Sequence, residues 1–339
     1  MQTKGPAKAD VDGKPRERLR MIDLAALAGV SAITVSRALR DSSLVRPDLR
    51  ERIKALAESQ GYKFSTAARN LRLMRSHAIA VVIDIDPSDE RPMGDPVYLA
   101  ALGGLLQEIT KARYRIILTT SEQIRSAATP DADGIILLGQ GSHEDAALQL
   151  ARFDTPLVIW GSAEGHVGPG VVIGSDNEGG GALIGQHLAA SRRRRVLYLG
   201  DATHPEIAAR IRGVRRGLGS DAVMVVAPCA FSAGSGREAL EGQLDGHLTF
   251  DAVVACSDLV AIGALEALKA RGLKTPEDVA VVGFDDSPIA ASASTPLTTV
   301  HQDWHAAGRL LARTMLGWLD GEEPQPEVLP VSLVVRASA

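Results

Sequence analysis

Aromatic residues make up only 4% of this 339-residue chain, which has two cysteines, Cys229 and Cys256. Two cysteines cannot form a disulfide framework, and these lack the ligand spacing of a zinc site, so we interpret both as small buried residues. No apolar run approaches the roughly 18 residues needed to span a bilayer. The first 20 residues are polar and contain no apolar segment of the signal-peptide kind. The sequence therefore predicts a soluble cytoplasmic protein that acts without a membrane, a metal or a cofactor.

The basic residues are concentrated at the front of the chain. Residues 1–76 hold 16 of the 37 Lys and Arg but only 8 of the 41 Asp and Glu, which leaves 21 basic and 33 acidic residues for the remainder. Contacts to phosphates require clustered Lys and Arg, so this asymmetry favours a polyanion-binding module joined to an acidic body. A solvated basic tail is the alternative that charge alone leaves open. Residues 1–18, which lack apolar periodicity, are expected to be a disordered basic tail.

Three short helices are predicted after this tail. Leu24, Leu27 and Ala28 repeat at helical spacing, Gly29 interrupts the pattern, and Ser31 offers an N-cap for a second helix. A third helix is predicted from Pro47, with apolar residues at i, i+4, i+7 and i+8, and is expected to end at Gly61.

Two short helices joined by a tight turn, with a third behind them, are typical of a helix-turn-helix module. Its second helix lies in the major groove, so its N-terminal residues are predicted to contact DNA. Arg37 can bind a guanine edge with two hydrogen bonds, whereas Thr34 and Ser36 can reach phosphates or bases. Ala25 lies four residues before Gly29, but any helical hairpin can contain this spacing, so a purely structural hairpin is the alternative. The predicted DNA-binding residues on this helix are Ser31, Ala32, Ile33, Thr34, Ser36 and Arg37.

From residue 78 onward, apolar strands alternate with helical patterns, which favours doubly wound parallel sheets. Nine strands in about 260 residues indicate two such sheets, with a ligand crevice between their carboxyl ends. The predicted strands are 79–85, 115–119, 134–138, 157–160, 171–173, 196–199, 223–226, 252–255 and 279–284. The predicted helices between them include 98–111, 178–190, 206–218, 236–244 and 259–270.

Several motifs at both ends of the chain occur together in one protein family. Residues 22–72 contain DLAALAGVS, TVSRAL, a third helix that ends in GY, and AARNL, and residues 251–303 contain CSD, VVGFDD and TTVHQD. In these motifs the chain resembles the LacI/GalR family of bacterial transcriptional regulators. The resemblance covers essentially the whole chain after the tail.

The resemblance implies a domain organisation. An all-α helix-turn-helix headpiece, residues 19–64, is followed by a hinge helix and linker, residues 65–76. The hinge helices of a dimer enter the minor groove in this family, where a leucine wedges between base pairs, and Leu71 holds that position. Residues 77–339 form an α/β core that is similar to periplasmic sugar-binding proteins. Its N-lobe is expected at 77–174 plus 303–329, and its C-lobe at 175–302 plus 330–336.

In that family a small effector binds between the lobes. Sugar recognition needs flat apolar faces for ring C–H groups and charged groups for paired hydroxyls. The resemblance implies stacking by Phe231 and Trp304, hydroxyl binding by Asp258 and contact from Arg210. Plain lobe core for the aromatic residues, a surface ion pair for Arg210 and a helix cap for Asp258 are the alternatives. Further cleft positions are Asp84, Tyr98, Trp160 and Gln302.

The resemblance implies a homodimeric repressor of carbohydrate-utilisation genes that binds pseudo-palindromic operator DNA. A small sugar-like effector is expected to change its operator affinity. A purine or other non-sugar effector is the alternative. A transport binding protein would need a signal peptide and no headpiece. An enzyme would need a paired acid/base constellation, and Asp285 and Asp286, adjacent on an extended segment, point to opposite faces.

Overall fold

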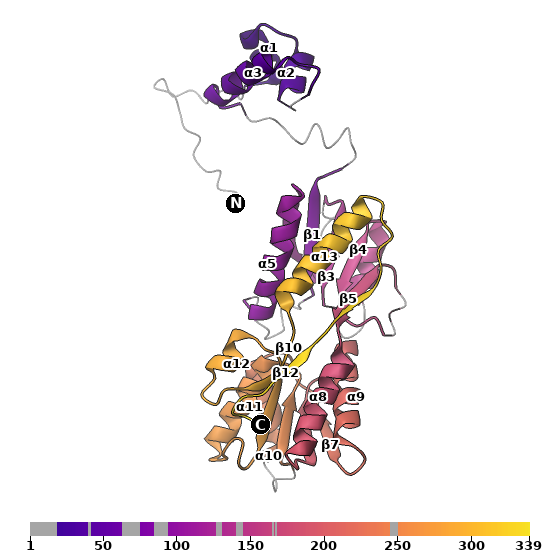
Figure 1. Ribbon diagram of the computed structural model, residues 1–339, viewed down its shortest axis with the longest axis vertical. Helices are drawn as coiled ribbons and strands as arrows, with labels where there is room; N and C mark the ends of the chain where they lie inside the picture. The colour runs from indigo at the N-terminus through magenta and orange to yellow at the C-terminus, as the bar shows by residue number, and fades with distance from the viewer. Residues whose placement is uncertain are drawn as a thin grey trace. The chain divides into compact units, whose positions relative to one another are not determined.

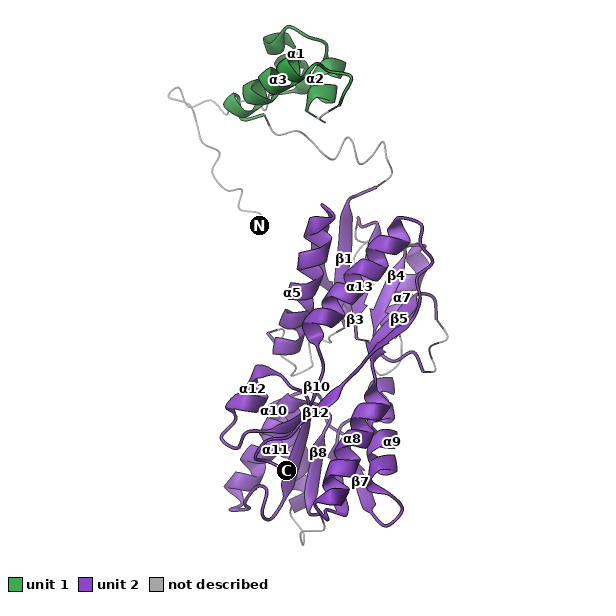
Figure 2. Ribbon diagram, viewed as in Figure 1, with its two compact units in different colours: residues 1–74 green, residues 75–339 purple. Residues whose placement is uncertain are grey.

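The computed structural model describes residues 19–39, 42–62, 75–84, 94–126, 131–139, 145–164, 166, 168–244 and 250–339. The chain divides into two compact units, residues 1–74 and residues 75–339 (Figure 2). The predicted tail, residues 1–18, and the predicted hinge helix with its Leu71 lie outside the described residues.

The described part of the first unit is a three-helix module built from α1 (Met21–Ala28), α2 (Ala32–Ala38) and α3 (Pro47–Ser59). Gly29 ends α1 with a left-handed φ of 69°, a conformation that glycine adopts without steric cost. Leu24, Val35 and Ile53, one from each helix, are fully buried against one another. This small core fixes the angle between α1 and α2, which are bent by 93°. No single described helix is long and apolar enough to cross a membrane, although α1 and α2 taken as a bent pair reach that length and composition.

The second unit contains two sheets with helices around each (Figure 1). The first sheet has the strand order β11-β5-β4-β3-β1-β2, and all of its pairings are parallel. We call the part of the chain around this sheet the N-lobe. Its strands are β1 (Ala78–Ile83), β2 (Arg115–Thr120), β3 (Gly134–Leu138), β4 (Leu157–Trp160), β5 (Val171–Ser175) and β11 (Glu327–Leu329). Its helices are α5 (Pro96–Lys111), α6 (Ser121–Ser126), α7 (Asp145–Leu150), the short 3-10 helix η1 (Ala151–Phe153) and α13 (Trp304–Leu319).

The second sheet, around which the C-lobe is built, repeats this plan with the order β12-β10-β9-β8-β6-β7. Its pairings are parallel except for β12, which runs antiparallel to β10. Its strands are β6 (Arg195–Leu199), β7 (Val223–Ala227), β8 (Ala252–Ala255), β9 (Ala280–Asp285), β10 (Thr298–His301) and β12 (Ser332–Val334). Its helices are α8 (Asn177–Ala190), α9 (Pro205–Leu218), α10 (Ala233–Leu244), α11 (Asp258–Ala270) and α12 (Pro288–Ser292).

The chain passes between the lobes three times: after β5, after β10 and between β11 and β12. Within each sheet, the strand order reverses next to the first strand of that lobe, β1 or β6. The carboxyl ends of parallel strands at such a reversal leave a crevice in which ligands bind. The topology therefore locates the candidate effector site before any side chain is considered.

Close helix packing fixes the walls of this crevice. In the C-lobe, α8 and α9 pack through glycines, and a Cβ added at Gly213 would lie 2.0 Å from the carbonyl oxygen of Glu178. In the N-lobe, a Cβ added at Gly308 of α13 would lie 2.0 Å from the carbonyl oxygen of Ala101 of α5. Only glycine permits these backbones to approach so closely.

The predicted fold class is confirmed, with a helix-turn-helix unit followed by a two-lobe α/β core with parallel sheets. All nine predicted strands are present, with ends that differ by at most a few residues. The strand list omits β10, β11 and β12, which have only three or four residues each. Segments this short carry too few residues for a periodic pattern, and these three also lack the run of four buried apolar residues that marks the equally short β4 and β8.

Candidate DNA-binding edge and effector cavity

One side of α2, together with its N-cap Ser31, forms an open edge. Ile33 is 63% exposed, and Ser31 and Arg37 are also exposed, whereas Ala32, Thr34 and Ser36 are half-buried. Val35 and Ala38 face the core of the three-helix unit, where they are fully buried. The six predicted DNA-binding residues of this helix therefore lie on the sides of α2 that the core leaves accessible.

Ser31 has a local structural role as well. Its hydroxyl oxygen accepts a hydrogen bond from the backbone N–H of Thr34 at 3.2 Å and lies 2.9 Å from the Thr34 hydroxyl. This is the N-cap arrangement predicted from the sequence, and it satisfies one of the unpaired N–H groups at the start of α2.

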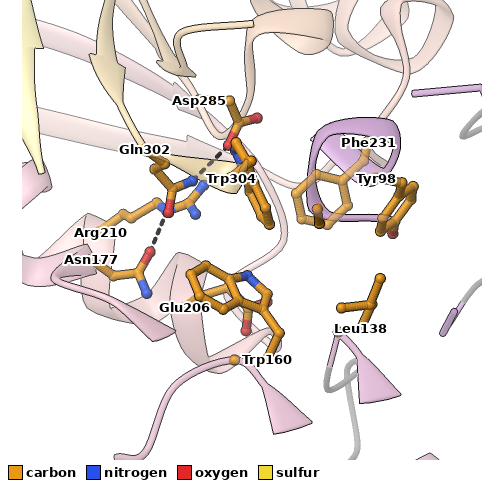
Figure 3. Close-up of a pocket in the computed structure, with 13 residues that line it drawn as sticks. Tyr98, Leu138, Trp160, Asn177, Glu206, Arg210, Phe231, Asp285, Gln302 and Trp304 are labelled. Carbon is orange, nitrogen blue, oxygen red and sulfur yellow. Dashed lines mark hydrogen bonds between the residues drawn. The ribbon is translucent and has the colours of Figure 1, made fainter. Parts of the chain in front are cut away.

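A cavity lies at the carboxyl edges of the two sheets, with an empty volume of about 600 Å³ that includes space open to solvent. Both lobes contribute to its wall, as Figure 3 shows. Six of the eight predicted effector-binding residues line it, namely Tyr98, Trp160, Arg210, Phe231, Gln302 and Trp304. The remaining lining residues are Ala101, Leu138, Gly139, Gly161, Asn177, Glu206 and Asp285.

Aromatic rings form the apolar part of the wall. Trp160, at the end of β4, and Trp304, at the start of α13, have ring centroids 5.1 Å apart at an interplanar angle of 51°. Phe231 makes an edge contact with His204, with centroids 5.4 Å apart. The indole N–H of Trp304 is buried and has no hydrogen-bond partner among the described residues. A buried indole N–H normally finds a partner, so this donor is available to a ligand.

Arg210 of α9 is held rigidly in the polar part of the wall. The side chain is 6% exposed, which excludes a surface ion pair. Its Nε donates to Asn177 Oδ1 at 2.8 Å, and its Nη1 donates to the backbone oxygen of Cys256 at 2.6 Å. The guanidinium carbon lies 3.7 Å from the centroid of the Phe284 ring, a cation–π contact. These contacts fix the orientation of the guanidinium group before any ligand binds.

Three further polar groups face the same space (Figure 3). Gln302, in the segment that crosses between the lobes, donates through Nε2 to Asp285 Oδ1 at 2.7 Å. Asp285 has a φ of 117°, which turns the chain at the end of β9, and is buried. Glu206, in the first turn of α9, has a buried Oε2 without a hydrogen-bond partner among the described residues.

Two predicted effector residues are not among the lining residues. Asp84 follows β1, and its side chain lies beside Gly139, where an added Cβ would be 3.5 Å from Asp84 Cβ. Asp258 is 1% exposed and lies beneath the wall. Its Oδ1 accepts from the Thr299 hydroxyl at 2.6 Å, and its Oδ2 accepts from the backbone N–H and hydroxyl of Ser287 at 2.7 and 3.0 Å.

These contacts change the interpretation of Asp258. Both carboxylate oxygens are occupied within the C-lobe, so the structure gives no support to direct hydroxyl binding. The N-cap of α11 is Ser257, so a capping role for Asp258 is wrong as well. Burial, followed by the nearby charge of Asp285, raises the pKa of Asp258 to about 8, against the opposing effect of the hydrogen bonds from Thr299 and Ser287.

The sequence prediction missed Asn177, Glu206 and Asp285 as lining residues. A usable signal was present, because Asn177 and Glu206 lie in the first turns of the helices that follow β5 and β6, and Asp285 ends β9. Residues at the carboxyl ends of parallel strands face the crevice, so position alone identifies them.

Comparison with known proteins places this architecture in a family. Residues 20–65 match the family described as bacterial regulatory proteins, lacI family, and residues 186–339 match the periplasmic binding protein-like domain. The regulator CelR of Thermobifida fusca is 32% identical, over 97% of this chain and 100% of its own. The chain belongs to the LacI family. It is therefore a helix-turn-helix transcriptional regulator, as the sequence predicts.

Other LacI-family members match over similar lengths. The repressor MelR of Bacillus subtilis is 30% identical over 94% of this chain and 97% of its own. The solved complex of CelR with cellobiose is 30% identical, with a TM-score of 0.68, over 95% of this chain and 100% of that one. The lac repressor dimer bound to operator is 22% identical with a TM-score of 0.83, over 95% of this chain and 99% of that one, and shows the shared fold.

Proposed function

We propose that this LacI-family regulator represses carbohydrate-utilisation genes and that a sugar-like effector controls its affinity for operator DNA. The observation that carries the proposal is the cavity between the lobes. It combines two tryptophan rings, a buried N–H without a partner and a rigid guanidinium group. Flat rings cover the C–H faces of a sugar, and polar groups at the edge hydrogen-bond to its hydroxyls.

The relatives support a sugar. One relative was solved with cellobiose, and another, from Haemophilus influenzae, is named the ribose operon repressor and is 25% identical over 94% of this chain and 98% of its own. A purine effector is the second candidate, because the purine repressor PurR of Haemophilus influenzae is 24% identical over 87% of this chain and 89% of its own.

The proposed DNA contacts are those of the open edge of α2, with Arg37 as the base-reading cation and Ile33 as an apolar contact to a thymine methyl. Leu71 is proposed as the minor-groove wedge of the hinge. A homodimer would present two such units to the two halves of a pseudo-palindromic operator, in the cytoplasm at the nucleoid.

The proposed control mechanism is linkage. The effector contacts residues of both lobes, so it favours the lobe arrangement in which those residues face one another. In the dimer that arrangement sets the spacing of the hinge segments, and operator affinity changes by the coupling free energy. The role is binding alone, and turnover of a sugar by the purified protein would contradict it.

The test uses gel shifts on the promoter fragment next to the protein's own gene. We expect salt-sensitive binding that Arg37→Ala and Leu71→Ala each weaken by about tenfold or more. Unchanged affinity in both variants would overturn the proposed docking.

A thermal-shift screen with cellobiose, glucose, ribose, adenine and hypoxanthine then tests the effector. Stabilisation by a sugar, accompanied by a change in the gel shift, supports the proposal. Stabilisation by a nucleobase and by no sugar would replace the sugar with a purine.

A further inference from the structure

The charge of the effector cavity is unbalanced. Among its described lining residues, the ionisable side chains other than tyrosine are Glu206, Arg210 and Asp285, which makes two carboxylates against one guanidinium group. Asp285 and Arg210 are 7% and 6% exposed, so these charges interact in a water-poor environment where screening is weak. The described part of the wall therefore holds more carboxylates than cations.

Arg210 is poorly placed to offset the charge of an added anion. Its Nε and Nη1 already donate to Asn177 and to the backbone oxygen of Cys256, and one face of the guanidinium group covers Phe284. A phosphate or carboxylate ligand is best held by a guanidinium group that offers two parallel donors. The contacts of Arg210 use two of its five N–H groups, so the pair formed by Nε and Nη1 cannot bind an added anion.

Two buried polar atoms without hydrogen-bond partners among the described residues indicate which chemical groups of a ligand can bind in the cavity. The buried Nε1 of Trp304 can only donate a hydrogen bond, and the buried Oε2 of Glu206, when ionised, can only accept one. The phosphate or carboxylate group of a sugar anion could accept from Trp304 but has no proton for Glu206, so only hydroxyl groups can donate to that atom. A hydroxyl group both donates and accepts, so a neutral polyhydroxy ligand can satisfy both atoms.

We propose that Glu206 is a specificity residue that restricts the effector to neutral, unphosphorylated sugars and rejects sugar phosphates and sugar acids. The inference rests on the proposed sugar-sensing function and names the chemical class that the site accepts. Binding of a sugar anion would bring its charge close to the carboxylates of Glu206 and Asp285 in a site with little water, which is discrimination by electrostatic repulsion.

The test is calorimetric titration of the full-length protein with matched neutral and anionic probes. These are glucose against glucose 6-phosphate and gluconate, and cellobiose against cellobionate. We expect the neutral member of a pair to bind at least about tenfold more tightly than its anion. Glu206→Gln keeps the shape of the side chain but removes its charge, so it should reduce this ratio by about tenfold. Glu238→Gln, which removes an exposed charge from α10, should leave the ratio unchanged.

A second variant separates charge from hydrogen bonding. Trp304→Phe keeps an aromatic ring and removes the N–H, so affinity for both members of a pair should fall together while their ratio stays constant. An anion that binds as tightly as its neutral partner would overturn the inference and leave sugar sensing intact. An unchanged ratio in Glu206→Gln would remove Glu206 as the cause. Absence of binding by every probe, neutral and anionic, would count against the sugar effector itself and the inference with it.

Discussion

The Thr299 hydroxyl donates a hydrogen bond to Asp258 Oδ1 at 2.6 Å, and both side chains are fully buried beneath the effector cavity. The bond joins β10, which leads into a crossing between the lobes, to the first turn of α11. Two more hydrogen bonds, from Ser287, occupy the other carboxylate oxygen. Because a buried carboxyl group lies at this junction, we expect the stability of the C-lobe to depend on pH.

The pKa of Asp258, raised to about 8 in the folded chain, gives a prediction for stability. An unfolded Asp has a pKa of about 3.9, so between roughly pH 4 and pH 8 the folded chain holds a proton that the unfolded chain has released. The free energy of unfolding should therefore fall as pH rises through this window, by at most about 1.4 kcal/mol per pH unit. Urea denaturation at several pH values, followed by circular dichroism, measures this slope. Asp258→Asn should flatten it, and an equal slope in the variant would contradict the prediction.

The contact between α8 and α9 gives a second prediction. A Cβ at Gly213 would lie 2.0 Å from the carbonyl oxygen of Glu178, so Gly213→Ala must separate the two helices. The expected cost is about 1–3 kcal/mol of stability. Effector affinity should also fall, because Arg210 lies one turn earlier on α9. The control is Gly242→Ala in α10, where nothing lies within 4 Å of an added Cβ and where alanine should stabilise the helix by up to about 1 kcal/mol. Equal melting temperatures for the two variants would refute the packing argument.

Arg210 itself gives a third prediction. Arg210→Lys removes the Nε donor to Asn177 and the planar group that covers Phe284. We expect a loss of stability on the order of 2 kcal/mol and at least about a tenfold loss of effector affinity, because lysine offers no planar fork of donors. Thermal melts and calorimetry measure both. Arg215→Lys, an exposed position on the same helix, should change neither.

The open edge of α2 gives a fourth prediction. Ile33 is 63% exposed, so Ile33→Ala should change the free energy of unfolding of the DNA-binding unit by no more than about 0.5 kcal/mol. Affinity for the operator should fall by about tenfold, while affinity for unrelated DNA and the salt dependence stay unchanged, because an apolar contact releases no counterions. Equal weakening on both DNAs would show that Ile33 does not read bases.

Sequence patterns located the helices of the first unit and the long buried strands because these elements carry clear periodicity and capping residues. Gly29 and Ser31 marked the turn between α1 and α2 correctly, for reasons that are local to the chain. The effector cavity is different, because its wall joins residues far apart in the sequence. Neighbouring residues on an extended segment point to opposite faces, and this rule correctly predicts that Asp285 and Asp286 have different surroundings. Asp286 pairs with Arg336 and His301. The rule could not show that Asp285 faces a ligand site, which depends on Gln302 lying opposite.

Asp258 shows that a motif can also suggest a ligand contact that the structure does not support. Its place in the CSD motif suggested a ligand contact, but burial and three hydrogen bonds assign it to the support of the wall. The burial and the hydrogen-bond partners of Asp258 depend on how α11, α12 and β10 pack together. The spacing of residues along the chain does not predict this packing.

Gln302 and Trp304 line the effector cavity, and the chain between β10 and α13 that contains them is also one of the three crossings between the lobes. In the proposed mechanism, the same few residues recognise the effector and bend when the lobes move. A substitution in this segment is therefore expected to alter both the affinity for the effector and the change in operator affinity that the effector causes. Glu206 lies in the first turn of α9, outside the crossings, so its proposed role as a specificity residue would allow a substitution there to change which effector binds without altering a segment that links the lobes.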